Sequence, residues 1–259
     1  KHLTFRSEIF NLVSLDGLFE QPVDLSHLES LDVSENSLEN LDCIAKYSAS
    51  VLSLKVLKAR KNGIRDVGIL VLPNLQELDL GHNQLERLPA VSGLPRLEVL
   101  ILSGNRISGS LKALSHLKHL RKLDVSGNRL NLKPSELASD LAEISAAETL
   151  VNLRLKDNPF VLTFPEYQAF ALIKLPLLRK LDDIATTAEM AKMRKVAKQE
   201  VDMSDLSKFD LLVRQRMSQK PRQGVLGDQS KEDVPCPAFA ELARLAEEAC
   251  LSRRAQGRF

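Results

Sequence analysis

Residues 119–130 read HLRKLDVSGNRL, and the spacing of the apolar residues in this stretch decides the fold. Apolar residues stand at positions 120, 123, 125 and 130, and Asn128 stands in the last and longest interval. An amphipathic helix needs intervals of three and four, and a half-buried strand needs intervals of two throughout. The stretch fits neither element alone, so its meaning depends on whether it recurs.

The pattern L-x-x-L-x-L-x-x-N-x-L, with other small or apolar residues replacing some leucines, occurs six times. The copies cover residues 28–38, 54–64, 75–85, 97–107, 120–130 and 150–160, and a partial copy follows at Leu175, Leu178 and Leu181. Their asparagines are Asn36, Asn62, Asn83, Asn105, Asn128 and Asn158, so the period is nearly constant except for a longer first and a longer last interval. Six copies with five matched positions each do not arise by chance in one chain.

The recurring unit resembles the leucine-rich repeat family. No single repeat can bury its own leucines, so the repeats must stack and bury them jointly. Each repeat opens with a short strand and then turns at the asparagine, whose amide pairs backbone groups that would otherwise cost about 1–3 kcal/mol each. We expect an α/β fold, a right-handed curved solenoid with a parallel sheet on the concave side and helices or 3-10 turns on the convex side, followed by an α-helical tail.

Repeat length predicts where the convex side carries helices. The longest interval, between Asn128 and Asn158, has room for a helix of about three turns that starts at Pro134. The next longest, which starts at Asn36, predicts a shorter helix around 41–52, with Leu41, Ile44 and Leu52 facing inward. The repeat that contains residues 93–95, Gly-Leu-Pro, is short and is expected to turn through irregular or 3-10 structure.

Residues 158–182 resemble the closing segment of intracellular leucine-rich repeat proteins. Those relatives include type-1 phosphatase regulators, a spliceosomal snRNP protein, the axonemal dynein light chain and tubulin-folding cofactors. Gln168 stands where an arginine often follows the tyrosine of that motif, here Tyr167, which weakens the transfer of any one relative's interactions. The expected segments are an N-terminal cap (1–24), the repeats (25–160), a C-terminal cap (161–185) and a helical extension (186–259) with a linker around 222–235.

Composition is that of an ordinary globular protein. Hydrophobic residues make up 44% of the chain and charged residues 27%. The net charge of +2 gives no global attraction to nucleic acid or to an anionic membrane.

The expected location of the protein is inferred from its cysteines. Cys43, Cys236 and Cys250 make neither a disulfide framework nor a metal-ligand pair, which indicates a reducing, intracellular location. The cytoplasm is expected, with cilium or cytoskeleton implied by the resemblance and the nucleus left open. The chain starts at Lys1, so a longer native chain is also left open.

Catalytic and metal-binding patterns are missing from the sequence. It contains no glycine-rich phosphate loop, and nothing brings a serine, a histidine and an aspartate together. His116 and His119 are spaced as two ligands on a helix would be, but no cysteine or carboxylate cluster accompanies them. We therefore predict that the protein is not an enzyme and holds no cofactor or metal.

Surface residues are the remaining candidates for function. The template places one set on the concave face, and Val56, Val99 and Ile101 are apolar there although solvent is expected, as is typical of partner contacts. The concave candidates are Asp32, Val56, Lys58, Arg60, Asp79, Val99, Ile101, Asp124 and Arg154. In the tail, basic residues on amphipathic helices are either solvated faces or contacts to an acidic partner, and they are Lys192, Arg194, Lys195, Arg214 and Arg216.

These features predict a non-catalytic scaffold or adaptor that binds one or more proteins of a larger assembly, with no small-molecule substrate and no membrane contact. One alternative is a regulatory subunit that binds an enzyme, such as a protein phosphatase, on its concave face. Another is a ribonucleoprotein subunit, although the basic clusters lack the interleaved aromatic residues of a base-stacking surface.

Overall fold

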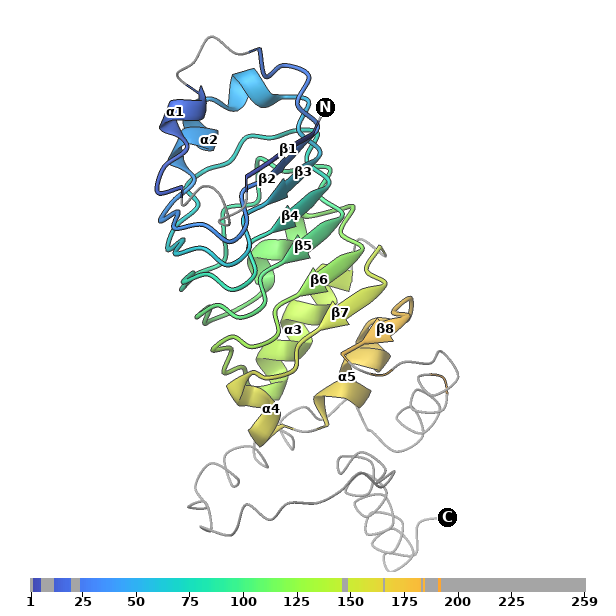
Figure 1. Cartoon of the computed structure of the whole chain (residues 1–259). Coiled ribbons are helices and arrows are strands. Elements are labelled where there is room, and N and C mark those ends of the chain that lie inside the picture. The colour runs from blue at the N-terminus through green and yellow to red at the C-terminus, as the bar shows by residue number, and fades with distance from the viewer. Residues whose placement is uncertain are drawn as a thin grey trace, which may run out of the picture.

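The computed structural model describes residues 2–5, 12–19, 24–145, 149–164, 166–182, 184 and 191, and its strands form one parallel sheet. The strands follow chain order from β1 to β8, so each repeat adds one strand beside its predecessor (Figure 1). Their bounds are β1 His2–Thr4, β2 Ser30–Asp32, β3 Val56–Lys58, β4 Glu77–Asp79, β5 Val99–Ile101, β6 Lys122–Asp124, β7 Asn152–Arg154 and β8 Lys180–Leu181. The expected leucine-rich repeat solenoid is confirmed.

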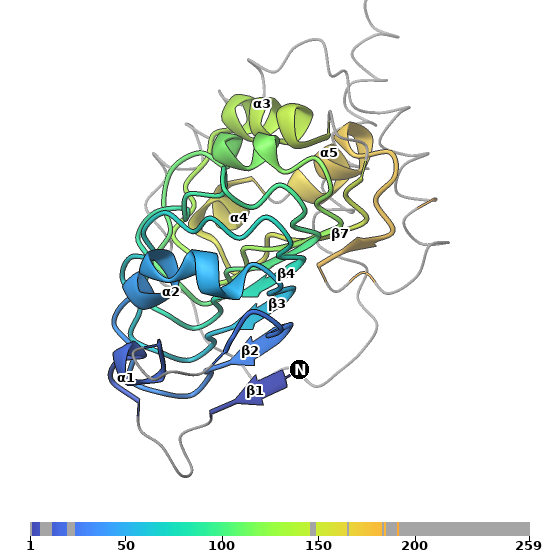
Figure 2. The same ribbon diagram turned by 90° about the horizontal axis from the view of Figure 1, so that it is seen from above.

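Helices lie on the side of the stack away from the sheet, as Figure 2 shows for α2 and α3. Their bounds are α1 Asp16–Phe19, α2 Asp42–Lys46, η1 Ser48–Val51, η2 Lys112–His116, α3 Pro134–Ser145, α4 Pro159–Thr163 and α5 Tyr167–Lys174. The helix predicted from Pro134 is confirmed as α3, and the repeat around Gly93 is irregular as expected.

The helix predicted around 41–52 is partly wrong. The chain forms two short pieces, α2 and the 3-10 turn η1, in place of one helix. Ile44 is fully buried as expected, but Leu52 is 46% exposed and Val51 is buried in its place. The 3-10 turn is wound more tightly than an α-helix, which shifts the inward position by one residue.

The core is a column of leucines that runs the length of the stack. The middle residue of each central strand is fully buried, and the register places each one opposite the next, as for Leu78 and Leu100. Each such side chain contributes about 1.5–3 kcal/mol through burial, and it reaches this burial only because a neighbouring repeat covers it.

The repeat asparagines join each repeat to the one before it. Asn105 is a typical member: its Nδ2 donates to the carbonyl oxygens of Leu80 and Leu102, both at 2.9 Å, and its Oδ1 accepts from the backbone N–H of Leu85 at 3.1 Å. The same arrangement holds at Asn36, Asn62, Asn83, Asn128 and Asn158. The predicted role of the asparagine is confirmed, and the backbone groups that it pairs lie inside the turns.

The residue before each asparagine adopts left-handed backbone conformation. Gly104 and Gly127 meet this need without strain, with φ of 68° and 63°. The other repeats place residues with side chains there, at φ between 54° and 59°: Glu35, Lys61, His82 and Asp157. Only two of the six positions hold glycine, the residue that prefers this conformation. The packing of one repeat on the next, and not residue preference, therefore sets the turn geometry.

Asp182 occupies the open edge after the last full repeat. Along the stack, the residue after each strand donates its backbone N–H to a carbonyl of the next strand, as Val125 does to Arg154 at 3.0 Å. At the end of β8 the counterpart of Arg154 is Asp182, which lies in a turn with a φ of 49°, and Leu155 N–H donates to its side-chain Oδ1 at 2.7 Å instead of to a backbone carbonyl. Lys156 N–H donates to the same oxygen, and Tyr167 Oη donates to Asp182 Oδ2 at 2.6 Å. A buried carboxylate thus replaces a backbone acceptor where β8 ends.

Replacing Asp182 with alanine is expected to lower the free energy of unfolding by about 2–4 kcal/mol, because three donors lose their acceptor. Chemical denaturation followed by circular dichroism measures this change. Tyr167→Phe removes one of the three donors and should cost about 1 kcal/mol. Equal stabilities of Asp182→Ala and the parent chain would contradict a closing role for this carboxylate.

The proposed division into two caps, repeats and extension stays a prediction. Apart from Ala191, residues 186–259 lie outside the described residues, as do parts of the N-terminal segment.

Candidate functional site

The concave face consists of two rows of side chains that the strand register brings together. The first row runs Ser30, Val56, Glu77, Val99, Lys122, Asn152, Lys180, and the second runs Asp32, Lys58, Asp79, Ile101, Asp124, Arg154. These positions alternate with the buried leucines, so they point to the opposite face of the sheet. Except for Arg60, which lies just beyond β3, the predicted concave residues all fall in these rows.

The three aspartates of the second row are fixed in place by their own turns. Each Oδ1 accepts the backbone N–H two residues later, for instance Gly81 to Asp79 at 2.9 Å. Asp32, Asp79 and Asp124 are all buried. They act first as turn residues, as is usual for aspartate at such positions. Burial raises the pKa of the Asp79 carboxyl, against the hydrogen bond from Gly81 and the nearby Arg60 guanidinium, which both lower it.

Two ion pairs cross between strands of the concave face. Lys58 Nζ lies 3.4 Å from Glu77 Oε1, and Arg154 Nη1 lies 3.5 Å from Asp124 Oδ2. Both cations are more than a third exposed, so each pair contributes little to stability. Their effect on the surface is to reduce its charge on either side of β5.

Val99 and Ile101 form an apolar patch on β5 between these two pairs. Both side chains are half-buried. The register surrounds Val99 with Glu77 and Lys122. An apolar centre with a charged rim is the usual anatomy of a protein-binding surface.

Val56, the third apolar concave residue, lies apart from this patch. In its row it stands between Ser30 and Glu77, so Glu77 separates it from Val99. The sequence template could not show this separation, because it does not state which strands are neighbours.

Arg60 reaches across to the following repeat over Gly81. A Cβ on Gly81 would lie 2.8 Å from Arg60 Nη1 and 3.1 Å from Asp79 Oδ1. Glycine at this position therefore makes room for the guanidinium beside the Asp79 carboxyl. The sequence had indicated only that Gly81 belongs to a repeat turn.

The predicted tail contacts Lys192, Arg194, Lys195, Arg214 and Arg216 lie outside the described residues. Within the described part of the chain, no group of three or more histidine, cysteine, aspartate or glutamate residues is arranged to hold a metal ion. The absence of an enzymatic activity, a cofactor and a metal stays a prediction.

The comparisons with known proteins match the repeats. The leucine rich repeat family model matches residues 53–107 and 73–130. Osteomodulin of Bos taurus is 29% identical over 171 residues, which is 62% of this chain and 38% of that protein. Vasorin of Mus musculus is 37% identical over 124 residues, 46% of this chain and 18% of that protein. Toll-like receptor 10 of Bos taurus is 32% identical over 129 residues, 48% of this chain and 16% of that protein.

The chain thus spans less than two-fifths of the length of each of these relatives. The repeats are leucine-rich repeats, and the matches support a role in protein–protein interaction. The intracellular subgroup suggested by residues 158–182 is not supported by them.

The expected intracellular, cytoplasmic location is wrong. Osteomodulin, vasorin and the Toll-like receptors are extracellular or membrane proteins, and they point away from an intracellular protein. In the described ranges, no helix has the length and apolar character needed to span a membrane.

The inference from the cysteines failed for a physical reason. Cys43 is buried, its Sγ donates to Asp16 Oδ1 at 2.7 Å, and burial raises the pKa of the thiol. A thiol protected in this way is unreactive whatever the redox state of its surroundings. The presence of an unpaired Cys43 therefore carries no information about the compartment.

Proposed function

We propose that this chain, whose described part is a leucine-rich repeat solenoid, is a non-catalytic binding protein that contacts a partner protein with its concave face. The Val99–Ile101 patch is the centre of the proposed contact. The charged rim of that patch consists of Lys58, Glu77, Lys122, Asp124 and Arg154. The rigid sheet presents these side chains before the partner arrives, so binding does not have to order them.

The single observation that carries this proposal is the position of the apolar patch. Val99 and Ile101 stand on β5, near the middle of the sheet, and ion pairs flank the patch on both sides. Energetically important interface residues cluster near the centre of a contact, where the surrounding residues exclude water. Scattered apolar residues on a solvated face would have no reason to occupy that place.

The charged rim of the patch favours a partner surface that carries both positive and negative groups. Glu77 and Asp124 are paired with Lys58 and Arg154, whereas Lys122 has no ion pair within the described structure. No sign of charge dominates, so steering by long-range attraction is weak and the contact depends on short-range complementarity.

Val99→Glu with Ile101→Glu is expected to weaken partner binding roughly 100-fold or more, because two carboxylates would be desolvated at the centre of the contact. A photo-crosslinking residue at position 122, at the rim of the patch, should join the partner in native extract. The double substitution should abolish that crosslink at a temperature at which circular dichroism shows the variant to be folded.

The matched control places the same crosslinker at Leu162, which is 86% exposed on α4, away from the sheet. Capture of the same partner from Leu162, or an unchanged crosslink at position 122 in the double variant, would reject the concave face as the contact. Asp124→Lys is unsuitable as a test, because Asp124 also accepts hydrogen bonds from Ser126 N and Oγ and its loss would disturb the turn.

A multi-subunit assembly remains part of the proposal in general form, with the partner's identity open. The ciliary, phosphatase and ribonucleoprotein alternatives depended on the intracellular resemblance, and no contact of the described residues favours any of them over the others.

A further inference from the structure

A hollow on the convex side lies over the two shortest repeats. The asparagines at positions 62, 83 and 105 are the most closely spaced of the series, and the chain between them has no room for a convex helix. The flanking repeats carry α2 with η1 on one side and η2 on the other. Between these helical elements the convex side has no helix, and a cavity of about 760 Å³ lies there, lined by residues 65–69, 84–90 and Arg106. The width of this cavity, which we call the convex groove, is set by repeat length.

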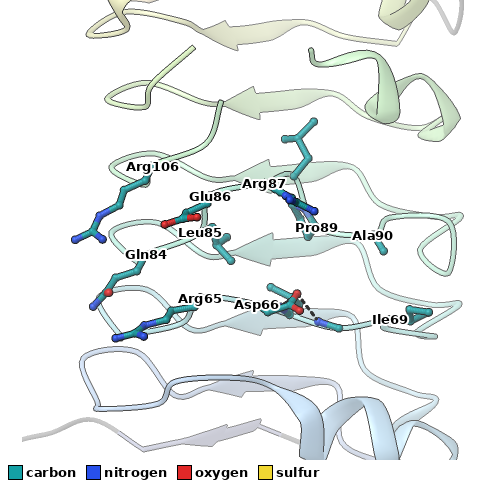
Figure 3. Close-up of a pocket in the computed structure, with 13 residues that line it drawn as sticks. Arg65, Asp66, Ile69, Gln84, Leu85, Glu86, Arg87, Pro89, Ala90 and Arg106 are labelled. Carbon is teal, nitrogen blue, oxygen red and sulfur yellow. Dashed lines mark hydrogen bonds between the residues drawn. The ribbon is translucent and has the colours of Figure 1, made fainter. Parts of the chain in front are cut away.

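Three arginines line the convex groove without a partner. The guanidinium groups of Arg65, Arg87 and Arg106 make no ion pair or hydrogen bond with the rest of the described chain. Figure 3 shows Arg65, Gln84 and Arg106 at the same end of the groove, with their polar ends extending in the same direction. Each planar guanidinium fork is suited to binding one carboxylate through two N–H donors, and the amide of Gln84 lies between the two arginines (Figure 3).

The carboxylates of the convex groove do not neutralise these arginines. Asp66 is engaged with its own turn, where its Oδ1 accepts the backbone N–H groups of Val67 and Gly68 at 2.8 and 3.1 Å. Glu86 lies between the arginines on the chain that forms the groove, but it has no ion pair with them (Figure 3).

The other end of the convex groove is apolar. Ile69 is 67% exposed there, and its backbone pairs in parallel with Ala90 of the next repeat. Val71, two residues further along, is 52% exposed. Charged and apolar contacts therefore follow one another along one extended path, as they do in grooves that bind extended peptides.

We propose that the convex groove binds an extended acidic peptide segment of a partner protein, with its carboxylates on Arg65 and Arg106 and an aliphatic side chain on Ile69. A nucleic acid fits this groove less well, because it carries a charge at every backbone unit, whereas the groove intersperses its arginines with Asp66, Glu86 and the exposed, apolar Ile69. No aromatic side chain lines the groove for base stacking either. This second surface is independent of the concave contact.

The test uses the full chain and a fluorescein-labelled peptide of alternating glutamate and valine, EVEVEVEV, in a fluorescence anisotropy titration. Arg65→Glu with Arg106→Glu should weaken binding roughly 10-fold or more, because both charge-assisted contacts become repulsive. Arg129→Glu is the matched control, since Arg129 is an exposed arginine of the same asparagine turn in the next repeat and lies outside the groove. It should change the dissociation constant less than about 2-fold, as expected of a surface charge outside the contact.

Two further results are expected. Val99→Glu with Ile101→Glu should leave peptide binding unchanged, which separates the convex groove from the concave contact. Hydrogen exchange should slow in residues 65–69 and 84–90 when the peptide is present. The proposal is overturned if the double arginine variant binds as well as the parent, if the lysine peptide KVKVKVKV binds equally, or if an oligothymidine of similar length binds more tightly and loses affinity in the same variant.

Discussion

Replacing Asn105 with alanine is expected to lower the free energy of unfolding by about 2–5 kcal/mol, since it leaves one buried backbone N–H unpaired and removes two further hydrogen bonds. Alanine leaves the buried N–H of Leu85 without an acceptor. The carbonyls of Leu80 and Leu102 each lose one of two asparagine donors, because they also accept from Asn83 and Asn128. Urea unfolding followed by far-ultraviolet circular dichroism measures the change.

The expected loss extends beyond one repeat, because two of the three partners belong to the preceding repeat. Hydrogen exchange should therefore accelerate at Leu85 and along β4 as well as around position 105, as in a stack whose stability depends on nearest neighbours. Asn131→Ala is the control, since Asn131 is exposed just after the next repeat turn. Its cost should be below about 0.5 kcal/mol. Similar losses of stability for both substitutions would mean that Asn105 acts only through the preference of asparagine for turn conformations.

Replacing Gly93 with alanine is expected to cost about 3 kcal/mol or more through overpacking. An added Cβ would overlap the carbonyl oxygen of Leu70 and lie 3.1 Å from both the carbonyl carbon of Leu70 and the Cα of Val71. All three are backbone atoms, which cannot rotate away as a side chain would. The two repeats would have to separate, and the hydrogen bond from Leu72 N to Gly93 O, now 3.1 Å, would be lost.

Gly63→Ala provides the matched comparison for Gly93. A Cβ there meets Leu38 O at 3.5 Å, an ordinary contact. The change should therefore be within about 1 kcal/mol of neutral. Thermal melts should place Gly93→Ala about 6–12 °C below the parent, given about 2–4 °C per kcal/mol for a domain of this size. If Gly93→Ala and Gly63→Ala had the same melting temperature, the convex segments of these repeats would not be in close contact.

The repeat pattern was sufficient to predict the leucine column, the asparagine bonds and the helix at Pro134. Each depends on a short local pattern repeated at near-constant intervals, and stacking turns the same pattern into the same contact every time. The rows of the concave face followed for the same reason, since strands in register align equivalent positions. The inward direction of Leu52 was wrong because the chain there formed a 3-10 turn, which periodicity alone does not reveal.

The candidate sites were predicted only in part. The sequence identified Val99 and Ile101 as apolar concave residues, but it also grouped Val56 with them and named Asp79 as a candidate contact residue. Burial and turn hydrogen bonds changed the meaning of that aspartate. The arginines of the convex groove were missed, although the closest spacing of the repeat asparagines marked the place where helices would be missing.

By itself the sequence determined the repeating unit, the need to stack it and the polar residue that joins one repeat to the next. The tertiary structure alone decided how closely neighbouring backbones approach at Gly93, which carboxylate accepts the backbone donors at the end of the sheet and where the convex side opens into a groove. Those features depend on distances between residues that lie a whole repeat apart in the sequence, which packing sets and which no local pattern of apolar and polar residues records.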